Sequence, residues 1–557
     1  MGNFSFWDYA VFVGYGLVIL CMGLWVSRDK KGESKSAEDY FLASKSLPWW
    51  AIGASLIASN ISAEQFIGMS GSGFAIGLAI SCYEWIAAAS LILVGKYFLP
   101  IFLKKEIYTM PQFLKQRFDG RVSMSLSVFW LLVYVFVNLT SVLYMGALSM
   151  NIIMGVPMMY GIIGLALFAA VYSIYGGLSA VAWTDVVQVV VLVFGGLLTT
   201  YLALDALSIG NGIWAGVQTA FEAAPEKFKM IVEKGTMIPD GSGGFVDAYD
   251  MLPGLGALLG GIWIVNLAYW GLNQYIIQRA LAGKSLKEAQ TGVVFAGYLK
   301  LLMPLIVVLP GIIAFVINQD PMAYNLSGSV ASINGTEGAD VAEGFMRITK
   351  SDEAYPWLLS TFIPTGLKGL AFAALTAAIV SSLASMINST STIFTMDIYK
   401  GHINVNAADN QLVKIGRIVS VIALVLAVCV APMLGALDQA FQFIQEFTGL
   451  VTPGVLVIFT MGLFWKRANA NGAFTVAALT FPLSWGAKMI LPSLPFLDRM
   501  FIVCLILAVV GVGVSLLTKK ENKGISLEKG LFKTDGVFNA LSIGICGILT
   551  VLYLIFW

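Results

Sequence analysis

Residues 53–73 read GASLIASNISAEQFIGMSGSG, and this stretch decides the fold. Apolar flanks make the surrounding segment long enough to cross a bilayer, but its centre is the polar run from Ala58 to Gln65. A continuous helix facing lipid would not carry such a run, because polar groups at membrane depth are costly. The pattern therefore predicts a transmembrane helix that is interrupted near its middle.

A second hydrophobic segment, at residues 252–277, is interrupted in a comparable way. It contains Gly260-Gly261, then Asn266, and later the pair Asn273-Gln274. If the first hydrophobic helix is an addition, the two interrupted segments are helices 1 and 6 of a core. Interrupted segments at corresponding places in two halves are typical of inverted-repeat transporters, in which unwound backbone lines the substrate cavity. The alternative is that these small and polar residues only mediate helix packing.

The composition places the chain in a membrane. Of its 557 residues, 58% are hydrophobic and 12% are charged, whereas soluble domains carry about 25% charged residues. The formal net charge of +1 gives no indication of a nucleic-acid partner. The five cysteines lie in apolar runs without CxxC spacing, which argues against a disulfide framework or a thiolate metal site. We therefore expect an all-α integral membrane protein whose main solvent is lipid.

Fourteen hydrophobic segments are long enough to cross about 30 Å of hydrocarbon, which takes about 20 residues. The ninth is too long for one crossing, so part of it is expected to form a separate outer turn. Two long connections, near 208–250 and 319–355, are rich in Gly, Ser, Asp and Asn and are expected to be flexible connectors. The segments are 7–27, 48–72, 77–102, 124–154, 158–175, 180–207, 252–277, 288–318, 357–397, 412–434, 437–465, 470–491, 498–518 and 537–557.

Basic residues indicate the orientation, because short cytoplasmic loops hold an excess of Lys and Arg. With the N-terminus outside, cytoplasmic loops receive 24 basic residues, Arg279 among them, and the exterior receives eight. We therefore expect both termini outside.

The expected organisation is an additional N-terminal helix and loop at 1–45, a first repeat of core helices 1–5 at 46–207, an external loop at 208–250, a second repeat of core helices 6–10 at 251–465, and peripheral helices 11–13 at 466–557.

Several charged and polar groups lie deep within the segments, and each is a candidate functional position. At 1.5 Å per residue, Glu84 lies about 10 Å and Lys300 about 20 Å along its segment. Gln445 and Glu446 lie within 437–465. Charges at this depth must face a cavity or one another, and a purely structural pair of Lys300 with a glutamate remains an alternative. Asp185 lies nearer a cytoplasmic end, where a capping or packing role is the alternative.

The ninth segment carries the pattern of a cation site. In residues 378–382, AIVSS, positions i, i+3 and i+4 share one helical face, which groups one carbonyl with two hydroxyls. Hard cations prefer oxygen ligands, and an unwound helix such as 58–61 has free carbonyl oxygens to complete the shell. Adjacent serines alone are weak support, since serine often bonds back to its own helix.

Enzyme motifs are absent from the sequence. There is no HExxH, GxxxxGK[ST] or GxSxG, and the glycine pairs at 71–73 and 254–256 lack the third glycine of a dinucleotide-binding motif. The single histidine, His402, is expected in a solvated loop. We therefore expect no enzymatic activity.

Six long, gap-free stretches resemble the sodium/solute symporter family, and within it the bacterial sodium/galactose symporters. The resemblance implies fourteen helices around a LeuT-like core of five plus five helices, in which helices 1 and 6 are broken. The stretches are GASLIASNISAEQFIGMSGSG (53–73), SCYEWIAA (81–88), VYSIYGGLSAVAWTDVVQ (171–188), NLAYWGLNQYIIQR (266–279), AAIVSSLASMINSTSTIFTMDIYK (377–400) and FQFIQEFTGLVTPG (441–454).

The resemblance also implies functional residues. One position departs from the galactose pattern, because Ala87 stands where a serine is usual, and this leaves the galactose or glucose preference open. A second sodium site looks incomplete, with Ala384 beside Ser385. The implied sodium ligands are Ala58, Ile61, Ala378, Ser381 and Ser382, with Asp185 on the sodium exit path. The implied sugar-binding residues are Asn60, Gln65, Glu84, Asn266, Lys300 and Gln445; the outer gate is Met69, Tyr83 and Phe441, and Tyr269 closes the inner side.

The expected function is sodium-coupled import of a hexose across a bacterial inner membrane by alternating access. Hexose hydroxyls need several amide and carboxylate partners, and the apolar ring face favours an aromatic plane. Na+ is the expected cofactor, a monomer is expected to suffice for transport, and an oligomer remains an alternative. The main functional alternative is a sodium symporter of the same family for an amino acid, a vitamin or an organic anion. A channel would require a continuous polar pore, which the sequence does not indicate.

Overall fold

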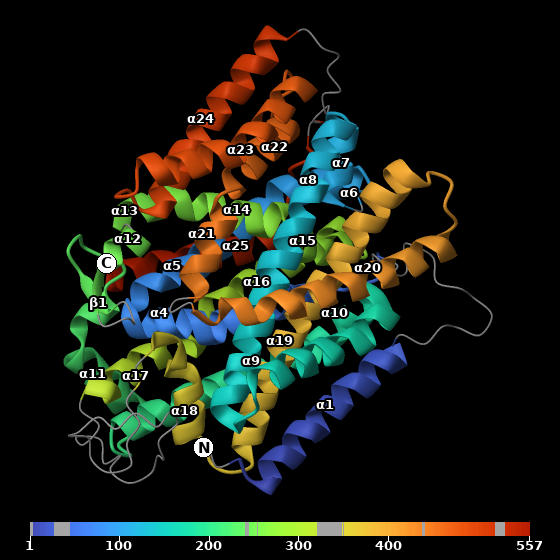
Figure 1. Ribbon diagram of the computed structural model, residues 1–557. Coiled ribbons are helices and arrows are strands. Elements are labelled where there is room, and N and C mark those ends of the chain that lie inside the picture. Colours follow the sequence, from blue (N-terminus) through green and yellow to red (C-terminus); the bar gives the residue numbers. More distant parts are fainter. Residues whose placement is uncertain are drawn as a thin grey trace.

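The protein is a bundle of packed helices with one small two-stranded sheet (Figure 1). The computed structural model describes residues 4–26, 45–107, 109–239, 244–252, 254–319, 348, 350–436, 440–518, 528 and 530–557. Within these ranges, 11 helices are long and apolar enough to cross a membrane, and two shorter apolar helices cover 158–171 and 452–464. Most of the predicted 319–355 connector, most of the loop after the first helix and part of the 519–533 loop lie outside the described residues.

The first part of the chain builds the helices that carry the predicted sugar-binding residues Asn60, Gln65 and Glu84 and the predicted sodium-path residue Asp185. Several of these helices contain wider π-helical turns, which often mark functional positions in helices. The elements are α1 (Phe6–Val26), α3 (Trp49–Asn60), η2 (Glu64–Met69), α4 (Ser70–Ala75), η3 (Leu78–Ser81), α5 (Cys82–Leu93), η4 (Val94–Phe98), α6 (Leu99–Lys104), α7 (Met110–Arg117), α8 (Gly120–Val133), η5 (Tyr134–Leu139), α9 (Thr140–Met154) and α10 (Met158–Leu207).

The middle of the chain adds the small sheet and the second interrupted helix. The two strands are antiparallel and pair Met237 with Asp247. The elements are α11 (Ile213–Ala223), η6 (Pro225–Phe228), β1 (Met237–Pro239), β2 (Phe245–Asp247), α12 (Ala248–Met251), α13 (Gly254–Gly256), η7 (Ala257–Gly261), α14 (Ile262–Leu272), α15 (Gln274–Leu281), α16 (Leu286–Ile306) and α17 (Val308–Gln319).

The last part contains α19, which has the largest buried share of the candidate membrane helices, and α23 and α24, which lie at the edge of the bundle in Figure 1. The elements are η9 (Ser351–Glu353), α18 (Ala354–Phe362), α19 (Leu367–Thr392), η10 (Ile393–Ile403), α20 (Asp409–Val430), η11 (Ala431–Ala436), α21 (Ala440–Gly449), α22 (Thr452–Phe464), α23 (Ala470–Ile490), α24 (Phe496–Leu517) and α25 (Gly536–Ile555).

Both predicted interruptions are present. Helix α3 ends at Asn60 because Ile61 has an extended backbone, with φ −76° and ψ 108°, and helical structure resumes only at Glu64. Helix α14 ends at Leu272, and Asn273, with φ −82° and ψ 122°, separates it from α15. Extended residues expose backbone groups that a regular helix would bond internally. The interruptions predicted within 48–72 and 252–277 are therefore confirmed, and the structure places them at Ile61 and Asn273.

The long predicted ninth segment divides as expected, but another prediction about spans was wrong. The chain between α18 and α19 is not helical, so α18 is the separate turn. The segments at 158–175 and 180–207, expected as two helices, are joined in the single 50-residue helix α10. A helix of that length measures about 75 Å, more than twice the hydrocarbon thickness. Hydropathy marks where a helix can cross, but not whether the backbone stays helical between crossings.

Two expected loops contain regular secondary structure in their described residues. The 208–250 connector contains α11, η6, the β hairpin and α12. Lys227 anchors it, because its ammonium donates to the Ala75 carbonyl at 2.6 Å and lies 4.1 Å from the ring centre of Phe315. Gly77, with φ +100°, permits this approach: a Cβ there would lie 2.4 Å from the Lys227 carbonyl oxygen. The prediction was wrong because composition does not report such anchors. His402 likewise lies in the last turn of η10, exposed, and not in a loop.

Helix α1 packs on α10 and α19 and exposes most of its large apolar side chains. Its buried Asp8 accepts hydrogen bonds from the backbone N–H groups of Gly366, at 2.7 Å, and Gly369, at 2.9 Å. These groups are at the start of α19 and have no partner within that helix. Helix α1 thus binds the N-terminal end of α19, the helix that carries Ser381 and Ser382.

Candidate functional site

A cavity of about 50 Å³ lies among α3, η2, α5, α14, α16 and α21. This volume holds a few water molecules, so a ligand the size of a hexose enters only if the surrounding side chains move apart. It brings together all six predicted sugar-binding residues and all four predicted gate residues, with Ala87 also in its wall. The lining residues are Asn60, Glu64, Gln65, Met69, Tyr83, Glu84, Ala87, Val265, Asn266, Tyr269, Trp270, Lys300, Phe441 and Gln445.

The two charges predicted at depth form an ion pair in the cavity wall. The Lys300 ammonium donates to the Glu84 carboxylate and to the side-chain oxygen of Asn60. Lys300 is 1% and Glu84 3% exposed, and the ammonium lies 5.1 Å from the ring centre of Trp270. Both interpretations of these residues hold, because they pair with each other and also face the cavity. The charges of this pair sum to zero.

Two amide side chains are oriented by bonds to nearby groups. The Gln65 side-chain oxygen accepts from the Ser62 N–H at 2.9 Å and from the Ser62 hydroxyl at 3.2 Å. The Asn266 side-chain nitrogen donates to the Ile262 carbonyl at 3.0 Å. Gln65 can therefore offer its N–H groups to a ligand, and Asn266 its oxygen. Fixed orientation makes these groups directional partners for a hydroxylated ligand.

Sequence reasoning passed over Glu64, which also lines the cavity. Its carboxylate accepts from the Ser141 hydroxyl at 3.1 Å. The signal was available, because Glu64 belongs to the same polar run as Asn60 and Gln65. On α21, Gln445 also faces the cavity, whereas the adjacent Glu446 turns away and pairs with Arg499 at 2.8 Å.

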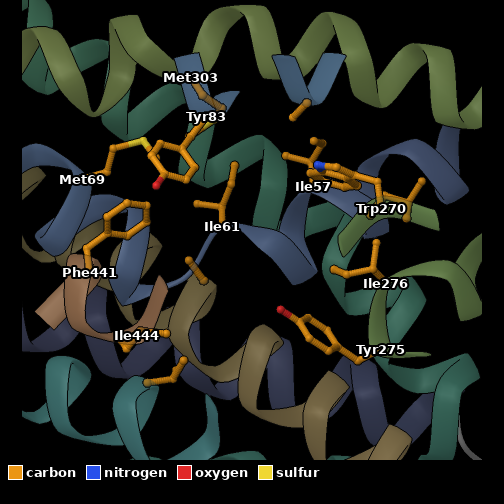
Figure 2. Close-up of a cluster of buried hydrophobic side chains, with 14 of the residues drawn as sticks. Ile57, Ile61, Met69, Tyr83, Trp270, Tyr275, Ile276, Met303, Phe441 and Ile444 are labelled. Carbon is orange, nitrogen blue, oxygen red and sulfur yellow. The ribbon is translucent and has the colours of Figure 1, made fainter. Parts of the chain in front are cut away.

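Aromatic side chains and Met69 form two parts of the cavity wall. Figure 2 shows Met69, Tyr83 and Phe441 grouped together, with the Tyr83 and Phe441 rings edge to face at 5.4 Å. All three are at most 5% exposed, so the predicted outer gate residues are buried against one another and their neighbours. Elsewhere on the wall, the Tyr269 hydroxyl accepts from the Asn60 side-chain nitrogen at 3.0 Å and shares a hydrogen bond with the Tyr275 hydroxyl at 2.6 Å.

The predicted sodium ligands meet where α3 ends against α19. The Ser382 hydroxyl lies 3.0 Å from the Ser59 carbonyl oxygen and 3.5 Å from the Ile61 carbonyl oxygen. Ala58, Ala378 and Ser381 are fully buried around this contact. Carbonyl and hydroxyl oxygens are the ligands that hard cations prefer. The Ser381 hydroxyl, however, donates to Asp185.

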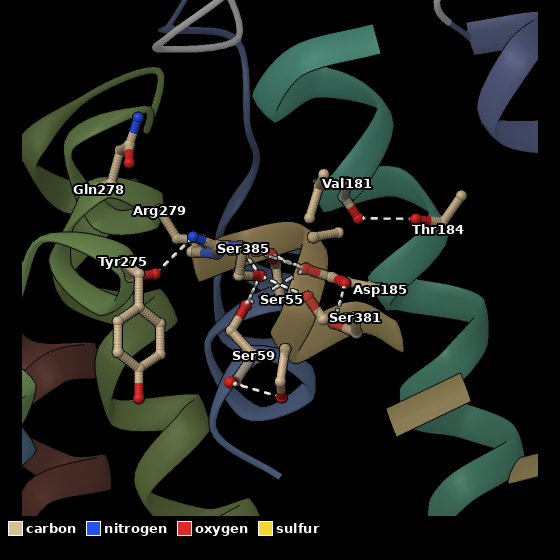
Figure 3. Close-up of polar contacts among 12 residues, drawn as sticks. Ser55, Ser59, Val181, Thr184, Asp185, Tyr275, Gln278, Arg279, Ser381 and Ser385 are labelled. Carbon is tan, nitrogen blue, oxygen red and sulfur yellow. Dashed lines mark hydrogen bonds and ion pairs between the residues drawn. The ribbon is translucent and has the colours of Figure 1, made fainter. Parts of the chain in front are cut away.

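Asp185 lies in a buried polar cluster made from four helices (Figure 3). Its carboxylate accepts from the hydroxyls of Ser381 and Ser55, the latter at 2.5 Å, and pairs with Arg279 at 3.9 Å. Both charged side chains are 0% exposed. Arg279, counted above as a cytoplasmic loop residue, is therefore a core residue. The sequence suggested a loop residue because Arg279 follows a hydrophobic segment. The one contrary signal was that Arg279 is the last residue of the matching stretch NLAYWGLNQYIIQR.

Three consecutive residues join the two sites. Ser59 offers its carbonyl to Ser382, Asn60 offers its side chain to Lys300 and Tyr269, and Ile61 offers its carbonyl to Ser382. This is possible because the extended backbone at Ile61 frees its carbonyl from the helix. A change of backbone at the break therefore reaches both the cavity and the oxygen cluster.

Comparisons with known proteins agree with this geometry. The Sodium:solute symporter family profile matches residues 40–479. The chain is 53% identical over 556 residues to a sodium/glucose cotransporter of Vibrio parahaemolyticus, covering 99% of this chain and 98% of that one. It is 35% identical over 479 residues to the sodium/myo-inositol cotransporter 2 of Homo sapiens, covering 84% and 67%.

A solved structure shows the same fold. It is a substrate-bound, outward-open Na+-coupled sialic acid symporter, 23% identical, with a TM-score of 0.76 over 93% of this chain and 99% of that one. The fold, the family match and the full-length relative agree with one another. The chain therefore belongs to the sodium:solute symporter family, as a sodium-coupled, multi-pass protein of the cell membrane.

Proposed function

We propose that this protein imports a hexose, glucose or galactose, together with Na+ by alternating access. The observation that carries the proposal is the cavity itself, whose amide, carboxylate and ammonium groups lie beside Trp270 and Tyr269. A hexose suits such a wall, because its hydroxyls take several directional hydrogen bonds and its ring face packs on an aromatic plane. The relative named for glucose supports this choice.

The paired charges argue against the main alternative. An amino acid or organic anion needs a helix N-terminus or an available cation for its carboxylate. Lys300 is already bonded to Glu84 and Asn60, so an anion would have to disrupt a buried pair. An uncharged polyol leaves the pair intact and can bond to both partners.

The proposed roles follow the positions in the structure. Sodium binds among Ala58, Ile61, Ala378, Ser381 and Ser382, and leaves past Asp185. The sugar binds Asn60, Gln65, Glu84, Asn266, Lys300 and Gln445, to which we add Glu64. Met69, Tyr83 and Phe441 form the outer gate, and Tyr269 the inner one.

The proposed architecture has fourteen membrane-crossing segments with both termini outside, and the continuous helix α10 contributes the two at 158–175 and 180–207. The repeats at 46–207 and 251–465 each begin with an interrupted helix, which supports an inverted-repeat core. The excess of basic residues in the loops assigned to the cytoplasm supports the orientation, and the burial of Arg279 removes only one of them. In this orientation the Asp185 cluster lies on the cytoplasmic side of the sodium site.

Coupling follows from the shared break. Sodium bound at the Ile61 carbonyl and the Ser382 hydroxyl holds the extended backbone, and this fixes the Asn60 side chain toward the sugar. A monovalent cation moving down the membrane potential gains about 2.3 kcal/mol per 100 mV. This free energy is available to accumulate an uncharged sugar.

Uptake into proteoliposomes tests the function. Labelled glucose, galactose, myo-inositol and a neutral amino acid are each offered under an inward sodium gradient and under an equal potassium gradient. We expect glucose or galactose to accumulate only with sodium, with myo-inositol as a weaker competitor. Equal uptake in both gradients, or sodium-driven uptake of an amino acid in preference to either hexose, would contradict the proposal.

A further inference from the structure

We propose that Arg279 is a tethered cation that occupies the exit side of the sodium site and competes with sodium for Asp185. Sodium leaves by displacing the guanidinium, and this displacement moves α15 and releases the inner gate beneath the sugar. The proposal rests on the sodium-coupled sugar transport described above, which it deepens by assigning a role to a residue outside both binding sites.

The guanidinium is held by oxygens of the kind that a sodium ion would use. It donates to the hydroxyls of Ser385 and, at 3.3 Å, Ser55, and to the Tyr275 carbonyl, and it faces the Asp185 carboxylate. A carboxylate, hydroxyls and a carbonyl form a typical set of hard-cation ligands. The structure thus places a positive group of the protein where a released sodium would first find a full set of oxygens.

The sodium site and the arginine cluster are directly connected. Ser381 and Ser382 are neighbours on α19, yet Ser382 faces the Ile61 carbonyl and Ser381 bonds to Asp185. Ser59 also serves both groups, because its carbonyl accepts from Ser382 while its hydroxyl lies 3.1 Å from Ser385. A sodium ion that loses one set of ligands can therefore pass to the next without crossing an apolar barrier.

Two like charges cannot share one buried carboxylate. A carboxylate near an opposite charge is stabilised in its charged form, and a second cation at the same place is repelled by the first. Asp185 and Arg279 are both 0% exposed, so water does not screen this competition. Arrival of sodium at Asp185 therefore requires that the guanidinium withdraw.

Withdrawal of Arg279 would act on the sugar cavity through α15. This helix is short, Gln274–Leu281, and follows the extended residue Asn273, which serves as its hinge. Arg279 bonds to the Tyr275 carbonyl one turn earlier, and the Tyr275 hydroxyl is bonded to Tyr269 in the cavity wall. A tilt of α15 that frees the guanidinium would separate Tyr275 from Tyr269, and so loosen the inner gate as sodium departs.

The test compares Arg279→Gln with Asp185→Asn/Arg279→Gln in the full-length protein. The first variant leaves Asp185 without its cation, so sodium should bind more tightly, by about tenfold, and be released more slowly. Net sodium-driven glucose uptake should fall by about tenfold, whereas glucose counterflow with saturating sodium on both sides should stay within about twofold of wild type. Counterflow does not require sodium release, so a merely structural defect would lower both rates equally.

The neutral double variant guards against misfolding, since it leaves no buried charge unpaired. Without the carboxylate, its sodium affinity should be weaker than wild type by about fivefold, and net uptake should recover relative to counterflow. The matched control is Arg121→Gln, which removes an exposed arginine paired with Asp119 at 2.9 Å and should change neither rate.

Calorimetric titration with sodium chloride, without sugar, measures sodium affinity independently of transport. Unchanged sodium affinity in the double variant, or an equal loss of uptake and counterflow in Arg279→Gln, would overturn the role of Arg279. A wild-type protein that binds sodium but neither accumulates nor exchanges glucose would instead contradict the hexose function and leave the sodium titration of the variants as the test of the arginine.

Discussion

Two buried ion pairs lie in the described part of the core: Lys300 pairs with Glu84, and Arg279 pairs with Asp185. They belong to the two sites that are joined by the break at Ile61, and their surroundings differ. The first pair lines a cavity of about 50 Å³ together with amides and aromatic rings. The second is enclosed by serine hydroxyls at 0% exposure. A neutral pair beside a cavity therefore suits a polyol, whereas a pair enclosed by oxygens suits exchange between cations.

The largest effect is expected on the sodium side. Ser382→Ala should lower sodium-driven uptake by roughly 100-fold, because a buried cation that loses an oxygen ligand keeps its desolvation cost. The matched control is Ser420→Ala, since Ser420 is a buried serine whose hydroxyl only bonds back to the Gly416 carbonyl at 2.9 Å. Uptake by Ser382→Ala with the sodium dependence of wild type would remove this residue from the site.

The sugar side should show a smaller effect. Gln65→Ala and Glu84→Ala should each weaken glucose or galactose binding by about tenfold, because a buried partner left unpaired costs about 1 to 3 kcal/mol. Titration calorimetry in saturating sodium measures the change. Gln290→Ala is the control, since Gln290 is a buried glutamine that bonds to the Gly95 carbonyl and does not line the cavity. Affinities within twofold of wild type for both variants would sink the sugar assignment.

Variants of Tyr269 should distinguish the contribution of its aromatic ring to transport from that of its hydroxyl. Tyr269→Phe keeps the ring and loses the hydrogen bonds to Asn60 and Tyr275, whereas Tyr269→Ala also removes the ring. Transport should therefore be about fivefold lower in the alanine variant than in the phenylalanine variant. A cysteine placed at Ala63 should also react faster with a thiol reagent from the cytoplasmic side in the alanine background. Equal labelling in folded wild-type and alanine backgrounds would contradict a gating role.

A third buried cation, Lys227, extends the comparison outside the membrane. It is held by a carbonyl and an aromatic ring in place of a carboxylate, and burial lowers its pKa to about 8, with nearby Glu226 opposing the shift. An unfolded lysine has a pKa near 10.4, so between pH 8 and about 10 the unfolded chain binds more protons. The free energy of unfolding should therefore rise with pH in this window.

Thermal unfolding of purified protein at pH 7 and pH 9 measures that effect, which should be about 1 to 2 °C. Lys227→Met keeps much of the side-chain volume without the titration, so its midpoint should lack this rise. The same pH response in both proteins would show that Lys227 is not its source.

Much of the functional core was predictable because the membrane makes polar residues expensive. The run at 58–65 could not belong to an unbroken helix facing lipid, and Glu84 and Lys300 at depth required a cavity or each other; the structure shows both. Polar residues within apolar segments can thus be identified individually from the sequence. Their transport roles remain predictions until the variants above are measured.

Other features depend on distant partners and could not be predicted in the same way. Arg279 looks like the first basic residue of a cytoplasmic loop unless Asp185 and Ser385 are known to lie beside it. Order in the 208–250 connector depends on Lys227 reaching Ala75. The continuity of α10 depends on backbone angles between two apolar stretches, which composition does not determine.

The most direct test of the account is whether sodium tightens sugar binding through the shared break. Calorimetric titration of wild-type protein with glucose, in sodium chloride and in potassium chloride at equal ionic strength, measures the coupling. We predict at least about tenfold tighter binding in sodium, with sugar tightening sodium binding by the same factor, as linkage requires. Equal glucose affinity in the two salts would contradict the claim that sodium at Ile61 and Ser382 orders Asn60 for the sugar.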